Sequence, residues 1–445
     1  MASVESLPNE ISAAIAHQCS FDALAQLSLT CKRLNAIAQP CLWSDIELHE
    51  QGFHESSAEL KAPAPFKLPS QRAYHNGGER EWPQDTRIKA EKLFKMFQAL
   101  HRHDETKLEE LASRVKNLCT VVDPTWRPDA DEADNPIPVW YLLPYFTNLE
   151  TLELHGDWHI TEETGSDIEG PPLAKLRFAK LHAYLPRAVG TYVLRSGAIL
   201  ERLELGMLDR PISTNLAYNS HFRPEENLGK DGDSDYGSLS GDAVIPRPQG
   251  DFFPSSPVSL PNLRHLYLCK ASKSGQLHTA YDYTLSSRAE RAALETWREI
   301  LLTSSPTLET LVLDHRPGAE YIENDTYTEA EYLREEKSGS GDVALVAMIE
   351  GVLFEKDAFP KLRQVYLNGL VVSHTSDGGP LDLVPGGRLM RRLQQRKVKC
   401  EARLGRWCFF DHDHGATDWA TWDGDSDDDD DDDGEVKWDT VLASV

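Results

Sequence analysis

The sequence has no long apolar run. No stretch of about 18 consecutive apolar residues occurs among its 445 residues, so no membrane-spanning helix is expected. The N-terminus carries Glu5 and Glu10, and it lacks the basic cluster and apolar core of a secretory signal. We therefore expect a protein that is neither inserted into a membrane nor secreted.

Paired cysteines are also missing. Seven cysteines are spread along the chain, their number is odd, and no two of them form a Cys-x-x-Cys pair. This pattern argues against a disulfide framework or a zinc ribbon, and it favours free thiols in a reducing compartment. The expected location is the cytoplasm or the nucleus.

The signatures of common catalytic sites do not occur. There is no serine elbow, P-loop, glycine-rich dinucleotide loop or His-Glu-x-x-His. Two His-containing segments, 155–159 and 408–414, are the only candidates for chemistry, and the second holds too few Cys and His for a closed zinc site. We expect no enzyme activity, metal or cofactor, and an enzyme or metal protein using these segments is the alternative.

Basic residues are scarce relative to acidic ones. The chain has 46 Lys and Arg against 72 Asp and Glu, a net charge of −26. Residues 411–439 contain thirteen Asp, Glu435 and one Lys, which account for half of that charge. Because phosphate contacts need Lys and Arg, this balance argues against general nucleic-acid binding.

The first fifty residues read as a small helical module. Pro8 suits the first turn of a helix that carries Ile11 and Ile15 on one face. Ser20 is a candidate N-cap for a second helix, and Pro40 is expected to end a third. A segment of this size does not bury so many apolar residues alone, so part of them must face the rest of the chain or a partner.

The order and spacing of these residues resemble an F-box. The matching positions are Leu7, Pro8, Glu10, Ile11, Ile15, Leu24, Leu27, Cys31, Lys32, Arg33, Leu42 and Trp43. The resemblance implies binding to a Skp-type adaptor and, through it, to a cullin ubiquitin ligase. It also implies that the adaptor-binding residues are Leu7, Pro8, Ile11, Ile15, Leu24, Leu27, Leu42 and Trp43.

A second motif, Leu-x-x-Leu-x-Leu, recurs along the chain. A degenerate first copy is Val115, Leu118 and Thr120, and the others begin at Leu149, Leu173, Leu200, Leu263, Leu308 and Leu362. The last two apolar positions alternate with polar ones, as in a half-buried strand, and helical stretches precede several copies. Strand and helix in repetition predict parallel strands with helices on one side.

This pattern resembles an irregular leucine-rich-repeat solenoid, so that the whole chain resembles a fungal-type F-box and leucine-rich-repeat protein. The intervals run from 24 residues (Leu149 to Leu173) to 63 (Leu200 to Leu263), which requires insertions. The predicted fold class is α/β. The predicted parts are a three-helix F-box (1–50), a linker (51–84), a solenoid (85–408) with disordered insertions (209–258 and 314–341), and a disordered acidic tail (409–445).

The polar positions between the repeat leucines are the candidate substrate surface. Alternate side chains of a strand point to opposite faces, so these residues should line one concave face. They comprise Thr151, Glu153, Thr310 and Val312, together with the candidate substrate-binding residues Lys175, Arg177, Arg202, Glu204, His265, Tyr267, Gln364 and Tyr366. The inserted loops are the rival surface.

The C-terminal region combines opposite charges. Residues 388–407 carry eight basic side chains on a predicted amphipathic helix, and 427–433 are seven consecutive Asp. The acidic tail is either a solubilising end or a segment that docks on a basic surface, in this chain or on a basic partner such as a histone.

The sequence thus predicts the substrate-recognition subunit of a Skp–cullin–F-box ubiquitin ligase, with an unidentified protein substrate. Two alternatives are an interaction scaffold that binds the adaptor without a cullin, and an acidic-tail binder of basic proteins.

Overall fold

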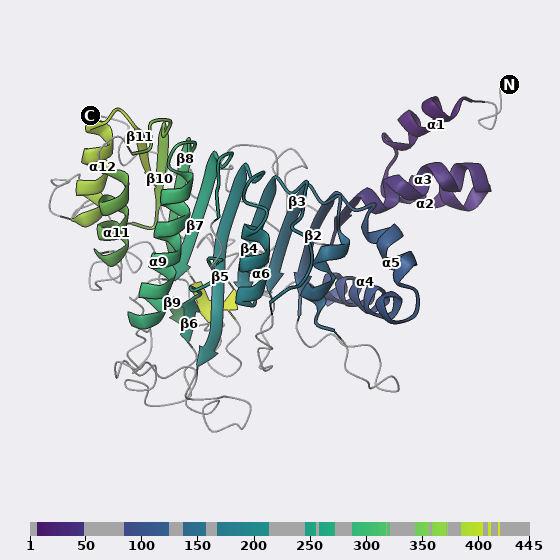
Figure 1. The fold of residues 1–445 in the computed structure, drawn as a ribbon, viewed down its shortest axis with the longest axis horizontal. Coiled ribbons are helices and arrows are strands. Elements are labelled where there is room, and N and C mark those ends of the chain that lie inside the picture. Colours follow the sequence, from purple (N-terminus) through teal and green to yellow (C-terminus); the bar gives the residue numbers. More distant parts are fainter. Residues whose placement is uncertain are drawn as a thin grey trace, which may run out of the picture.

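The computed structural model joins a helical module to one end of a long parallel sheet (Figure 1). It describes residues 7–48, 84–123, 137–156, 167–212, 245–254, 258–271, 287–316, 318–320, 343–355, 358–370, 372, 384–403, 408–410 and 417–418. Within these ranges, no helix has both the length and the apolar character needed to cross a membrane.

The N-terminal module consists of α1 (Asn9–Ala16), α2 (Phe21–Thr30) and α3 (Lys32–Ser44). The Ser20 side chain accepts a hydrogen bond from the Ala23 amide at 3.4 Å and caps α2, as predicted. Pro40 does not end α3, because the helix continues through it to Ser44. Pro40 is exposed and lies in the last turns, where the missing amide removes a single helical hydrogen bond.

Nine parallel strands form the main sheet, in the order β1-β2-β3-β4-β5-β7-β8-β10-β11. A tenth strand, β6 (Ile245–Pro248), pairs antiparallel with β5. The nine are β1 (Asp45–Glu47), β2 (Asn117–Val122), β3 (Thr151–Gly156), β4 (Phe178–Tyr184), β5 (Arg202–Ile212), β7 (His265–Ala271), β8 (Thr310–Arg316), β10 (Gln364–Asn368) and β11 (Lys399–Arg403). A separate small sheet joins β9 (Gly318–Glu320), β12 (Cys408–Phe410) and β13 (Thr417–Asp418).

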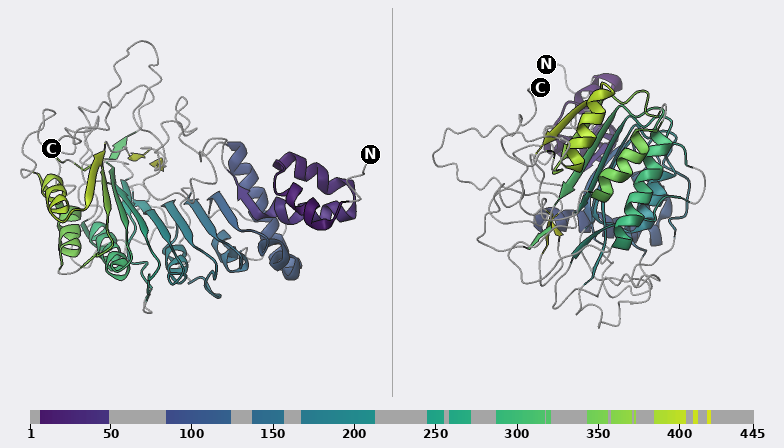
Figure 2. Two further views of the ribbon diagram at one scale, coloured as in Figure 1. Left: turned by 90° about the horizontal axis from the view of Figure 1, so that it is seen from above. Right: turned by 90° about the vertical axis from the view of Figure 1, so that its left-hand side faces the viewer.

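Helices connect the strands, and several of them lie along one face of the sheet. They are α4 (Gln84–His103), α5 (Glu105–Ala112), η5 (Val139–Tyr145, a 3-10 helix), α6 (Arg187–Leu194), α9 (Ser287–Ser304), α11 (Val343–Leu353) and α12 (Pro385–Gln395). Figure 2 shows α6, α9, α11 and α12 side by side along the same face. The α/β class and the solenoid-like arrangement of parallel strands and helices are therefore confirmed.

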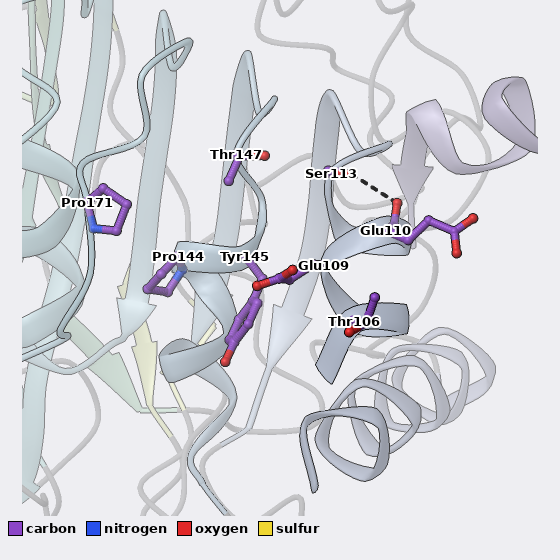
Figure 3. Close-up of a pocket in the computed structure, with 8 residues that line it drawn as sticks. All are labelled: Thr106, Glu109, Glu110, Ser113, Pro144, Tyr145, Thr147 and Pro171. Atoms are coloured by element: carbon purple, nitrogen blue, oxygen red, sulfur yellow. Dashed lines mark hydrogen bonds between the residues drawn. The ribbon is translucent and has the colours of Figure 1, made fainter. Parts of the chain in front are cut away.

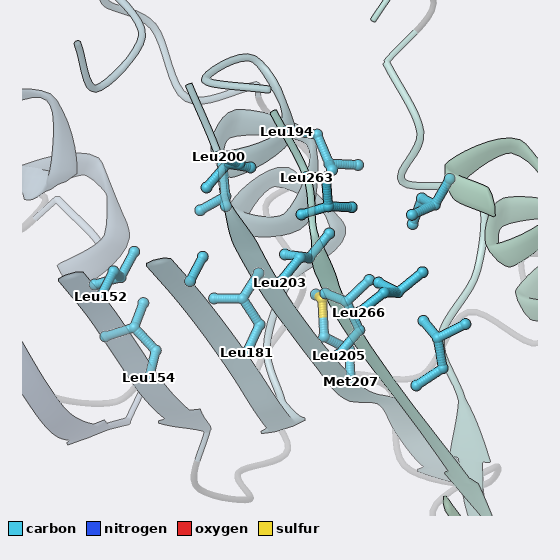
Figure 4. Packing of buried hydrophobic residues seen from close by; sticks show 14 of the residues in the cluster. Leu152, Leu154, Leu181, Leu194, Leu200, Leu203, Leu205, Met207, Leu263 and Leu266 are labelled. Carbon is cyan, nitrogen blue, oxygen red and sulfur yellow. The ribbon is translucent and has the colours of Figure 1, made fainter. Parts of the chain in front are cut away.

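The repeat leucines form the core between the sheet and these helices. Leu152, Leu203 and Leu266 are fully buried and lie side by side with Leu154 and Leu205 (Figure 4). At about 25 cal/mol per Å² of buried apolar surface, this continuous cluster is the main source of stability. The predicted copies from Val115, Leu149, Leu200, Leu263, Leu308 and Leu362 are all in the predicted register.

The β4 copy of the motif differs from the prediction. The sequence pattern predicts that this copy starts at Leu173, whereas it starts three residues later at Leu176, and Ala179 takes its central apolar position. Ala179 is fully buried, but a pattern of leucines does not find an alanine. A shift by an odd number of residues exchanges the two faces of a strand. Lys175 and Arg177 consequently lie before β4, not on it.

The module and the sheet are joined without a break in hydrogen bonding. The Lys116 amide donates to the Ser44 carbonyl at 2.8 Å, and the Leu48 amide donates to Cys119 at 2.9 Å. The chain that leaves α3 thus becomes β1, the first strand of the sheet, and Ile46 is buried in the main core. The orientation of the module is set by the same backbone ladder that orders the repeats.

Several predicted segments lie mostly outside the described residues. These are the linker (51–83), most of the two insertions (213–244 and 321–341) and most of the acidic tail (419–445). The ends of the first insertion belong to the sheet, because β5 extends to Ile212 and β6 begins at Ile245. Phe252, also within the predicted insertion, is fully buried in the main core.

One row of charged residues alternates in sign along the strand starts. Each member immediately precedes a strand, and from the second member on, each amide donates to the carbonyl of the preceding member at 2.7–2.9 Å. We call these residues the strand-entry row: Lys116, Glu150, Arg177, Glu201, Arg264, Glu309 and Arg363. Neighbouring strands are about 4.8 Å apart, so every charge in the row has an opposite charge beside it.

We expect Arg177→Glu to destabilise the protein by about 0.5–1 kcal/mol, because it places a third carboxylate between Glu150 and Glu201. Arg177 Nε now donates to Glu201 at 2.8 Å. Urea unfolding at low salt measures the effect, which 1 M NaCl should reduce. Lys175→Glu, two residues earlier and outside the row, is the matched control. Equal effects of the two substitutions would show that the row contributes nothing.

Candidate functional site

Two apolar side chains of the N-terminal module are exposed together. Ile11 and Ile15 lie four residues apart on α1, and their exposed fractions are 49% and 47%. The N-terminal end of α1 is held in place, because Arg33 Nε donates to the Asn9 side chain at 2.9 Å and its guanidinium also donates to the Leu7 carbonyl. The pair is therefore presented on a helix with a fixed start, and the described residues leave about half of its apolar surface exposed.

The other predicted adaptor-binding residues divide between the surface and the interior. Pro8 is exposed and Leu7 is half-buried. Leu24 is 6% exposed and forms the small core of the module with Ala16 and Ala38, against which Leu27 and Leu42 pack. Those three leucines thus hold the module together.

Trp43 points toward the repeats. Its ring lies 6.1 Å from that of Phe97 on α4, and Phe97 in turn packs edge-on against Phe146 at 5.6 Å. Trp43 Nε1 donates to the Gln39 side chain at 3.0 Å. The structure therefore gives Trp43 a role at the junction between module and sheet, with its indole largely engaged inside the chain.

The sheet face opposite the repeat leucines carries a buried charged cluster, which we call the polar sheet face. Glu153 on β3 lies at its centre: its Oε1 is 2.5 Å from Lys180 Nζ and 2.7 Å from His155 Nε2. Glu153, Lys180 and His155 are each less than 7% exposed. Opposite charges this deeply buried stabilise one another only as a set, because removal of one leaves the other desolvated.

Aromatic and polar contacts extend this face across further strands. The His155 and His182 rings are 5.7 Å apart, and His182 stacks on Tyr267 at 5.9 Å. Gly206 on the intervening strand β5 pairs with His182 in register and has no side chain, which leaves space for that stacking. The Tyr267 hydroxyl donates to Asp314 on β8.

A second buried pair lies on β5 of the same face. Arg202 Nε donates to Glu204 Oε1 at 2.8 Å, and the Arg202 guanidinium lies 4.9 Å from the centre of the Phe178 ring. The motif copy predicted from Leu173 would place Phe178 at its third apolar position in the core, whereas the shifted register of β4 brings it to this face. Both charged side chains are about 5% exposed, so neither offers its charge to an approaching partner.

The structure brings six of the eight candidate substrate-binding residues to the polar sheet face. Arg202, Glu204, Tyr267 and Tyr366 are buried there, while His265 and Gln364 are half-buried. Lys175 and Arg177 lie apart, at the strand-entry side, where Lys175 donates to the Asn148 side chain at 2.7 Å and Arg177 pairs with Glu201.

Sequence reasoning missed residues that are central to this face. Lys180 and His182 fall outside the motif copy predicted at Leu173, and Asp314 lies beyond the six-residue pattern of β8. His155, predicted as a candidate for chemistry within 155–159, is buried on this face. The signal was present in the alternation Lys180-Leu181-His182, which has the period of two expected for a strand. The exposed Leu29 of α2 was also missed.

Burial shifts the pKa of two groups on this face, Cys119 and His265. Burial and the neighbouring Glu153 carboxylate raise the pKa of the Cys119 thiol well above its usual value, which keeps it protonated. Burial and the nearby Arg202 guanidinium lower the pKa of His265, which favours its neutral form. Among the residues that the structure describes, no group of three or more Cys, His, Asp or Glu could hold a metal.

A separate cavity of about 630 Å³ lies at the N-terminal end of the repeats. Figure 3 shows it between α5, η5 and Pro171. The Tyr145 hydroxyl donates to Glu105 at 2.6 Å, and burial together with that carboxylate raises the pKa of Tyr145 to about 12. Glu110 is already paired with Lys107 at 2.7 Å and with Arg114. Tyr145 and Glu110 of the lining are thus held in contacts with other side chains, and Glu109, Thr106 and the rings of Pro144 and Pro171 lie beside them.

Comparison with known proteins gives a family for the N-terminal module alone. Residues 4–49 match the F-box-like family. No curated protein matches the chain. The match covers the three helices and β1. It therefore includes α1, which carries the exposed Ile11 and Ile15.

Proposed function

We propose that this chain, with its F-box-like domain at residues 4–49, binds a Skp-type adaptor through Ile11, Ile15 and Pro8. F-box domains bind such adaptors, and the observation that carries the proposal is the uncovered isoleucine pair on α1. Apolar side chains on a held helix bury surface at low entropic cost, as the centre of an interface requires. Leu24, Leu27 and Leu42 support this surface from beneath, and Trp43 ties it to the repeats.

We further propose that the repeats present a protein substrate for ubiquitination as part of a Skp–cullin–F-box ligase. The continuous hydrogen bonding from α3 through β1 to β2 supports this, because it keeps the module and the sheet in a fixed relative position. The chain would act by proximity and perform no bond chemistry itself. We interpret the whole chain as a fungal-type F-box and leucine-rich-repeat protein of the cytoplasm or nucleus.

The candidate substrate surface is limited to those residues of the polar sheet face that are accessible to a partner. His265 and Gln364 remain candidates, and exposed Lys399 on β11 joins them. The buried residues Arg202, Glu204, Tyr267 and Tyr366 are reassigned to shaping this face. Arg177 is reassigned to the strand-entry row.

The test is reconstitution of the full-length chain with a purified Skp-type adaptor and then with a cullin. We expect a stoichiometric complex with the adaptor on size-exclusion chromatography, and recruitment of the cullin by that complex. Adaptor binding without cullin would favour the scaffold alternative. Failure to bind the adaptor would refute the proposal.

A further inference from the structure

The helix α12 and the strand β11 lie at the end of the sheet opposite the N-terminal module (Figure 1). They carry a cluster of exposed basic residues. On α12, Leu389, Met390 and Leu393 are buried, so the arginines between them face outward. We call the exposed set the basic patch: Arg388, Arg391, Arg392, Arg396, Lys397 and Lys399.

Part of this patch is held in position. Arg392 Cζ lies 3.8 Å from the centre of the Phe354 ring, and Arg396 Cζ lies 5.0 Å from it. Arg396 also donates to the Leu353 carbonyl at 2.6 Å. Arginines that are stacked and hydrogen-bonded before binding lose less side-chain entropy when they engage an anion.

The charge of the patch is only partly balanced by its described neighbours. Arg392 Nη1 is 2.9 Å from Glu350, and Lys399 Nζ is 4.0 Å from Glu401. All six basic side chains of the patch are exposed, so positive charge predominates on the described surface of α12 and the start of β11. A chain with a net charge of −26 concentrates positive charge here, which selects a strongly anionic occupant.

We propose that the acidic segment 423–435 of the same chain binds the basic patch. This segment contains nine Asp and Glu435 in thirteen residues, so it matches the patch in charge density. It begins 20 residues after Arg403, the end of β11, and an extended chain of that length spans up to roughly 65 Å. Covalent attachment gives the segment an effective concentration of about millimolar, whereas a separate polyanion must approach a negatively charged molecule.

The contact places carboxylates against the exposed basic side chains of α12 and β11. It covers Lys399, which lies in the strand at the edge of the candidate substrate surface, so a substrate that uses this edge must displace the segment. The inference does not rest on adaptor binding, because the patch and the N-terminal module lie at opposite ends of the sheet (Figure 1).

Carbodiimide cross-linking of the full-length protein tests the contact, since it joins a carboxylate to a lysine amine in direct contact. We expect mass spectrometry to find cross-links from 423–435 to Lys397 and Lys399 at least fivefold above those to the exposed Lys175 and Lys361. These cross-links should decrease at least fivefold in 0.5 M NaCl. A mixture of ¹⁴N- and ¹⁵N-labelled protein identifies links within one molecule.

The decisive variant is Arg388→Glu/Arg391→Glu, which keeps both lysines and their distance along the chain from the segment. We expect it to remove the preferred cross-links while the circular dichroism melting curve stays unchanged. If the reversal perturbs α12, Arg388→Gln/Arg391→Gln provides the milder variant, with a smaller loss. Three outcomes would overturn the proposal. They are uniform cross-linking of all exposed lysines, cross-links that form only between molecules, and cross-links that the arginine variants leave unchanged.

Discussion

Replacing Ile11 and Ile15 with Asp should weaken binding of a Skp-type adaptor roughly a thousandfold. Each substitution places a carboxylate at the centre of the proposed apolar interface, and truncation of a central anchor costs about 2 kcal/mol or more. Two such losses sum to about 4 kcal/mol, which corresponds to about three powers of ten in Kd. Isothermal titration calorimetry of the full-length chain with the purified adaptor measures the change.

Because both isoleucines are exposed, this experiment separates an effect on adaptor binding from an effect on folding. Since they are about half exposed in the free chain, their replacement should lower the melting temperature little. Val343→Asp on α11 is a matched control, because Val343 is 50% exposed and lies at the far end of the sheet. Wild-type affinity in the double Asp variant would show that the adaptor uses another surface, and exposed Leu29 would then be the first alternative.

Glu153→Ala should lower the free energy of unfolding by about 3–5 kcal/mol, the cost of removing one partner from a buried charged set. The Glu153 carboxylate is 1% exposed and contacts both Lys180 and His155. Without it, the Lys180 ammonium remains near His155 in a site with little access to water. Chemical denaturation followed by circular dichroism measures the loss.

Two further variants separate the effect of charge from that of packing. Glu299→Ala removes an exposed carboxylate on α9 and should change stability by about 0.5 kcal/mol or less. Glu153→Leu/Lys180→Met removes both buried charges at similar volume and should recover most of the stability. A loss in Glu153→Ala no larger than that in Glu299→Ala would mean that water reaches the cluster.

The fold was largely predictable, because its signals are local. The period-two alternation around each repeat leucine identified six strands in their correct register, and the helical spacing of Ile11 and Ile15 identified α1. The exceptions have local causes as well. Ala179 replaced a leucine in β4, and β11 uses Cys400 and Ala402 at its apolar positions, so neither strand fits a leucine pattern.

The candidate surfaces were less predictable. The sequence identified which residues alternate with the leucines, but it did not show that Glu153, Lys180 and Arg202 would be buried with their partners. Nor could it separate Leu24, which closes the small helical core, from Ile11, which stays exposed. Exposure depends on which elements pack together, and contacts between distant segments are not encoded in the period of any one of them.

The sequence alone therefore determined an F-box-like helical module, a repeating parallel sheet and two opposed clusters of charge. The tertiary structure decided which apolar residues of the module remain available to a partner, and it joined that module to the repeats through β1. It also aligned the alternating charges of the strand-entry row. Those features depend on the register and spacing of strands that are far apart in the chain, which are set by packing of the whole core.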